Sequence, residues 1–92
     1  HRLALPHEEW VVEQLTQAVT HYPDDAGLRM KLSVAQSRTG LHDKAIETLE
    51  TMLERQMGRP FLIHKSLAEE YELLGNCEAS RRHRKMYLDS RE

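Results

Sequence analysis

The chain has 92 residues, of which 39% are hydrophobic and 30% charged, with a formal net charge of -2. This length fits one small domain, and the composition is too apolar for a disordered tail and too polar for a membrane span. The balance of 13 basic and 15 acidic residues gives no global attraction to nucleic acid. A single cysteine cannot form an internal disulfide, so the compartment is undetermined and the cytoplasm is only the default.

Three prolines and three of the four glycines mark helix boundaries. Glycine accepts the left-handed backbone conformation that closes a helix, and proline fits a first turn. Between these marks apolar residues recur at spacings of three and four, and no stretch alternates long enough for a strand. The boundary residues are Pro6, Pro23 and Pro60 at helix starts and Gly40, Gly58 and Gly75 at helix ends. The sequence therefore predicts an all-α protein with helices over 7–21, 25–39, 43–56, 60–74 and 77–90.

Each predicted helix carries an apolar stripe, and the stripe of the last is the weakest. Asp24, Asp43 and Asn76 are the expected N-caps, because a short side-chain oxygen can accept an unpaired backbone N–H. Loops of two to four residues would pack consecutive helices antiparallel, as helical hairpins. In chain order the stripes are Val12, Leu15, Val19 and Tyr22; Leu28, Leu32 and Ala35; Ala45, Leu49 and Met52; Ile63, Leu67, Tyr71 and Leu74; and Ala79, Met86 and Tyr87.

Equivalent residues recur along the chain at separations of 34 or 35. A period of 34 with a helix–turn–helix unit is typical of tetratricopeptide repeats, and the sequence resembles that family over essentially its whole length. The pairs that carry the resemblance are Val11 and Ala45, Leu15 and Leu49, Ala45 and Ala79, Leu32 and Leu67, and Gly40 and Gly75.

The resemblance implies a short right-handed α-solenoid, with a half repeat over 7–23 and full repeats over 25–58 and 60–90. Small residues, such as Ser33 and Ala68, lie where two helix backbones would approach closely. The repeats are degenerate: Arg29 and His64 replace an expected aromatic residue, Gln36 replaces a tyrosine, and His83 replaces a bulky apolar residue. A plain helical bundle is the alternative. Because the chain opens on histidine, we also expect it to be a fragment of a longer protein.

In the resembled family, the first helices of successive units line a concave groove that binds extended peptides. The resemblance therefore implies a protein-interaction scaffold, not an enzyme, that binds a partner peptide or helix without a cofactor. The asparagines of the family's carboxylate clamp are absent, so capture of a chaperone C-terminus is not predicted. The candidate groove residues are Lys31, Val34, Arg38, Lys65, Glu69 and Glu72.

Self-association is the alternative function, with Trp10 and Val11 on the open N-terminal face as candidates, or packing of a regulatory domain on an adjoining domain. Nucleic-acid binding through the basic last helix is disfavoured, because Arg81, Arg82, Arg84 and Lys85 spread around the helix and no aromatic residue is interleaved with them.

No metal or catalytic site is predicted. The six histidines contain no pair at the i, i+4 spacing that places two imidazoles on one helix face. Cys77 and His83 lie too far apart on one helix for a nucleophile and its base. We therefore interpret the histidines as scattered and Cys77 as a small apolar residue near a turn.

Overall fold

The computed structural model describes residues 7–90, and every regular element in that range is a helix. The helices are α1 (His7–His21), α2 (Ala26–Arg38), α3 (His42–Glu54), α4 (Pro60–Leu73) and α5 (Cys77–Ser90). The predicted fold class is therefore confirmed. Each boundary lies within two residues of its predicted position, except that Pro6 lies outside the described residues.

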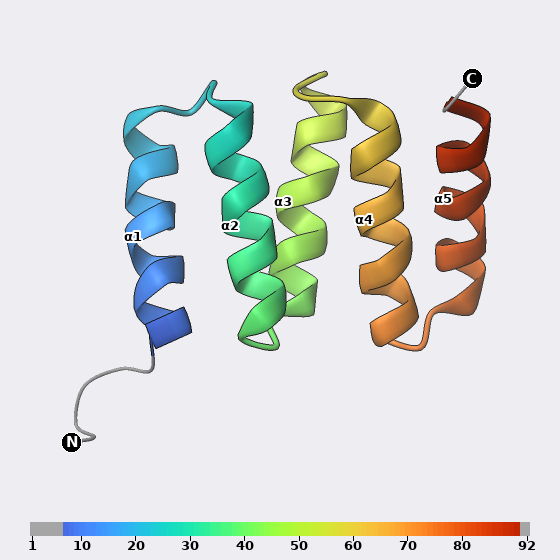
Figure 1. Ribbon diagram of the computed structural model, residues 1–92, viewed down its shortest axis with the longest axis horizontal. Helices are drawn as coiled ribbons and strands as arrows, with labels where there is room; N and C mark the ends of the chain where they lie inside the picture. Colours follow the sequence, from blue (N-terminus) through green and yellow to red (C-terminus); the bar gives the residue numbers. More distant parts are fainter. Residues whose placement is uncertain (1–6, 91–92) are drawn as a thin grey trace.

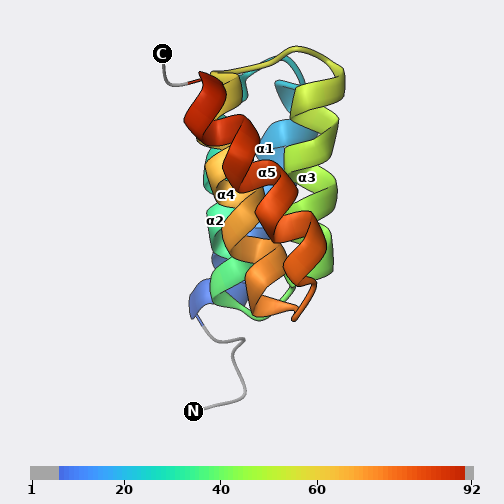
Figure 2. The same ribbon diagram turned by 90° about the vertical axis from the view of Figure 1, so that its right-hand side faces the viewer.

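The helices stand side by side, and each runs antiparallel to the one before it (Figure 1). Their principal contacts join consecutive helices, so α1 packs mainly on α2 and α5 mainly on α4. The molecule measures 46 × 29 × 17 Å, and Figure 2 shows α2 and α4 in one layer with α3 in the other. This row of stacked hairpins has no single central axis, which rules out the plain bundle. None of the helices described is long and apolar enough to cross a membrane.

The helices end where backbone geometry requires glycine. Gly40, Gly58 and Gly75 all have a positive φ, between 75° and 82°, which glycine adopts without the steric cost that a Cβ brings. After α3 the chain also passes through Gln56 at φ 57°, so this turn uses one non-glycine residue in the left-handed region. Pro60 occupies the first turn of α4, as predicted.

Two of the three predicted N-caps are wrong. Asn76 caps α5, because its Oδ1 accepts a hydrogen bond from the Ala79 backbone N–H at 3.1 Å. The cap of α2 is Asp25, whose Oδ1 accepts a hydrogen bond from the Leu28 N–H. The neighbouring Asp24 forms an ion pair with Arg55, which follows the last residue of α3. Asp43 lies inside the first turn of α3, which begins one residue earlier, at His42, without a side-chain cap.

The core lies between α3 and α4. Its buried apolar side chains form one cluster that Met30, Leu53, Met57 and Tyr71 flank. Small residues allow the helices to approach, since Ser33, Ala45, Ala68 and Ala79 are all buried. The polar Gln36 is also buried, and the Thr48 hydroxyl donates a hydrogen bond to its Oε1 at 2.8 Å. The cluster consists of Ile46, Leu49, Met52, Ile63 and Leu67.

Leu67→Ala should lower the free energy of unfolding by about 2–5 kcal/mol, because Leu67 has no exposed surface and its removal leaves a cavity. Urea unfolding followed by circular dichroism measures this loss. Leu73→Ala is the matched control on the same helix, since Leu73 is 62% exposed and the change should stay within about 0.5 kcal/mol. Equal losses for both variants would contradict the placement of the core.

Candidate functional site

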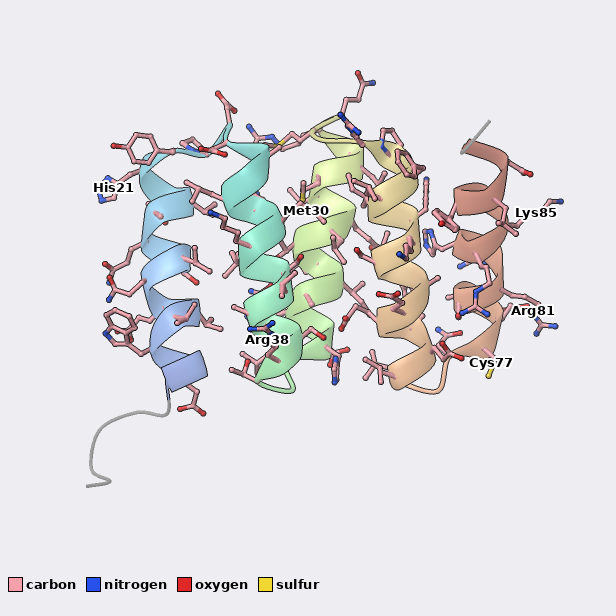
Figure 3. All side chains as sticks on the ribbon, viewed as in Figure 1. His21, Met30, Arg38, Cys77, Arg81 and Lys85 are labelled. Carbon is pink, nitrogen blue, oxygen red and sulfur yellow. The ribbon has the colours of Figure 1, made fainter. Side chains whose placement is uncertain are left out.

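An open, mostly apolar groove of about 560 Å³ runs between α1 and α2. From α1 it is lined by Trp10, Val11, Gln14 and Leu15, and from α2 by a stripe that begins at Met30 and ends at Arg38. Figure 3 shows Met30 in the upper part of α2 and Arg38 at the lower end of the same helix. The α2 residues of the lining are Met30, Lys31, Val34, Ala35 and Arg38.

The groove combines exposed apolar surface with two positive charges. Trp10 is 51% exposed and Val34 48%, which is high for large apolar side chains. Lys31 and Arg38 are the ionisable members of the lining, and neither forms an ion pair within residues 7–90. The groove therefore offers apolar contact together with a net positive charge.

The second hairpin shows what the equivalent positions look like when a helix covers them. Val11 and Leu15 on α1 correspond to Ala45 and Leu49 on α3, 34 residues later. Ala45 is 0% and Leu49 1% exposed, because α3 packs on both α2 and α4. Val11 and Leu15 are only half-buried, because α1 packs mainly on α2. The groove is thus the position at which α1 has no second neighbour among the described helices.

The structure brings five of the eight predicted site residues together. Lys31, Val34 and Arg38, proposed for a peptide groove, line the same surface as Trp10 and Val11, proposed for self-association. The other three candidates lie on α4 and are exposed outside this groove. One of them, Glu72, forms an ion pair with Arg84 of α5, with 3.3 Å between Glu72 Oε1 and the guanidinium nitrogen. The three residues on α4 are Lys65, Glu69 and Glu72.

A cluster of two histidines and a tyrosine, which the sequence analysis missed, joins α4 to α5. The Nδ1 atoms of His64 and His83 lie 2.9 Å apart, and their rings are stacked at a centroid distance of 5.2 Å. The Tyr71 ring also stacks on His83, with a centroid distance of 5.6 Å and almost parallel ring planes. His64 and His83 are two of the departures from the repeat pattern. The signal was present, because each replaces a residue that would pack against its neighbouring helix.

Tyr71 links this pair to α3. Its hydroxyl donates a hydrogen bond of 2.6 Å to Glu50 Oε2. The pKa of Tyr71 is raised to about 12, first by burial and then by the hydrogen bond to Glu50 and the charge of that carboxylate, against a smaller opposing effect of Arg82. Burial lowers the pKa of both His64 and His83 below the ordinary 6.5.

A second histidine contact joins α3 to α4. His42 Nδ1 lies 2.8 Å from Glu70 Oε1, and the Glu70 side chain is almost fully buried. This contact provides the buried carboxylate with a hydrogen-bond partner, which a buried polar group requires. It explains why a glutamate is tolerated inside the α3–α4 interface.

Within residues 7–90, the candidate metal ligands, Cys77 and the basic residues of α5 do not come together in a site. Across residues 7–90 no three histidine, cysteine or acidic side chains gather where they could hold a metal ion. Cys77 begins α5 directly after the turn that follows α4, and its side chain is exposed. Figure 3 shows Arg81 and Lys85 extending from α5 away from the row of helices, and both are exposed.

Comparison of the chain with protein-family models, curated proteins and solved structures finds no match.

Glu50→Gln should lower the pKa of Tyr71 from about 12 part of the way toward its ordinary 10, because the carboxylate charge is lost while the burial stays. Ultraviolet absorbance of the phenolate during an alkaline titration measures this change. Tyr71→Phe identifies the contribution of Tyr71 among the three tyrosines. An unchanged Tyr71 titration in Glu50→Gln would show that the contact with Glu50 does not persist in solution.

Proposed function

We propose that the chain is a non-enzymatic interaction module, built as a tetratricopeptide-like stack of hairpins, that binds an amphipathic helix of a partner protein between α1 and α2. The observation that carries this proposal is the open groove of about 560 Å³ with its exposed apolar lining. Contiguous apolar surface that is rimmed by charge is characteristic of a protein-binding site. The resemblance to tetratricopeptide repeats supports the same class of function.

A helix is the occupant that the internal repeat favours. In the second hairpin, α3 has helices on both sides, and its residues Ala45 and Leu49 are buried. A partner helix beside α1 would bury Val11 and Leu15 in the same way. Such a helix would present apolar residues at i, i+3 or i+4, and i+7, which is the usual pattern of helix-in-groove recognition.

The charges of the groove favour an acidic partner over a second copy of this chain. In a two-fold symmetric dimer the same patch faces itself, so Lys31 and Arg38 of one copy would face the positively charged lining of the other. The lining contains no acidic residue that would compensate them. Glutamate or aspartate at the edges of a partner's apolar stripe would instead pair with both cations.

Trp10 makes this proposal directly measurable, because it is the single tryptophan of the chain and lines the groove. The probe is a synthetic amphipathic helix with leucines on one face and glutamates beside them. We expect saturable change in Trp10 fluorescence, with a dissociation constant on the order of micromolar, or about -8 kcal/mol. The double variant Lys31→Glu with Arg38→Glu should weaken binding about tenfold or more.

Lys65→Glu is the matched control, since this lysine lies on α4 outside the groove. It should leave the affinity unchanged, and circular dichroism should show equal helix content in all variants. Equal binding of a lysine-flanked version of the peptide would contradict the charge argument. Sedimentation that reveals dimers in the absence of peptide would instead identify a second copy as the occupant.

A further inference from the structure

The interface between α4 and α5 contains two imidazoles that share one hydrogen bond. His64 Nδ1 and His83 Nδ1 lie 2.9 Å apart, and the ring planes differ by 26°. A hydrogen bond between two ring nitrogens requires a hydrogen on one and a lone pair on the other. The packed position of α5 therefore requires at least one of the two histidines to be neutral.

The charged and titratable groups around the pair come from all three neighbouring helices. Tyr71 of α4 stacks on His83 and is neutral at physiological pH. Glu50 of α3 favours a charge on His83, whereas Arg82 of α5 and a charged His64 disfavour it. The surroundings thus accept one proton more readily than two, since a second positive charge would lie directly against the first.

We propose that the His64–His83 pair makes the packing of α5 on α4 sensitive to pH, so that acidification releases α5 from the rest of the row. When both imidazoles are charged, both Nδ1 atoms carry hydrogens that point at each other, and the shared hydrogen bond is lost. When α5 leaves, each histidine reaches water and binds its own proton. The released state therefore holds more protons than the packed state, and acid favours release.

The directions of the two pKa shifts determine whether acid strengthens or weakens the packing of α5. Burial lowers the pKa of both histidines below 6.5, and the charge of His64 lowers that of His83 further. A histidine with a lowered pKa in the folded state contributes stability that is fully present above 6.5 and is lost as the pH falls through that value toward the lowered pKa. A difference of one bound proton changes the release equilibrium about tenfold per pH unit.

The architecture allows α5 to leave without disrupting the other helices. Its principal contacts are with α4 alone, and the contact includes the Phe61–Tyr87 ring pair and the buried Ala79 and Ser80. The larger apolar cluster between α3 and α4 does not include any residue of α5. Acidification would therefore expose one end of the row and leave the centre folded.

Amide hydrogen exchange of the 92-residue chain, measured by NMR in a buffer that contains a metal chelator, tests the proposal. We expect the protection of α5 amides, corrected for intrinsic exchange, to fall about tenfold per pH unit below about 6.5, while α3 amides change much less. Protection of α5 that stays constant, or that falls in parallel with α3, would overturn the proposal.

His64→Gln and His83→Gln form the second arm, because glutamine keeps a donor and an acceptor but does not titrate. Each single variant should flatten the pH dependence of α5, and the double variant should remove it. His21→Gln is the matched control at the exposed end of α1 and should retain the wild-type slope. A folded double variant with an unchanged slope would also overturn the proposal. The profile of the unmodified chain remains decisive if the variants do not fold.

Discussion

The arrangement depends on the burial of α3 between α2 and α4. Leu49 and Met52 on α3, together with Ile63 and Leu67 on α4, are almost completely shielded from water. Burial of a side chain of this size contributes about 1.5–3 kcal/mol. Ala45 and Ala68 on the same two helices are also buried, and their methyl side chains take little space between packed helices. Each outer helix packs mainly on one neighbour, and the most completely buried large side chains lie on α3 and α4.

The two functional proposals concern the two ends of the row, where each outer helix packs mainly on one neighbour. The groove at α1 exists because Val11 and Leu15 are apolar at positions whose counterparts on α3 are covered. At the other end α5 is strongly polar, and its contact with α4 includes the titratable His83 in place of a purely apolar residue. Segments that respond to ligands are drawn from the less stable parts of a protein. The buried centre therefore carries two outer helices that are each held mainly by one neighbour.

The sequence predicts the helices and their antiparallel order well, because spacing and punctuation by glycine and proline are local signals. It is less reliable where two neighbouring residues offer the same chemistry. Asp24 and Asp25 are both suitable caps, but the structure uses Asp25 as the cap, whereas Asp24 pairs with Arg55, which is 31 residues away in the chain. The groove prediction included residues of α4 because the family pattern treats both units alike. The structure instead places the apolar groove beside α1, between α1 and α2. His64 and His83 were recognised separately as departures, but their contact depends on the α4–α5 packing, which no spacing rule within one helix describes.

The order of contacts also has a mechanical consequence. Because α1 and α5 lie at opposite ends of the row and neighbours along the chain hold one another, a pulling force would act on the outermost rods first. Each outer helix would separate from its neighbour and lengthen the molecule by the extended length of that segment, while α2, α3 and α4 stayed packed together. Such a chain would behave as a stepwise extensible tether, with its weakest links at the points of attachment.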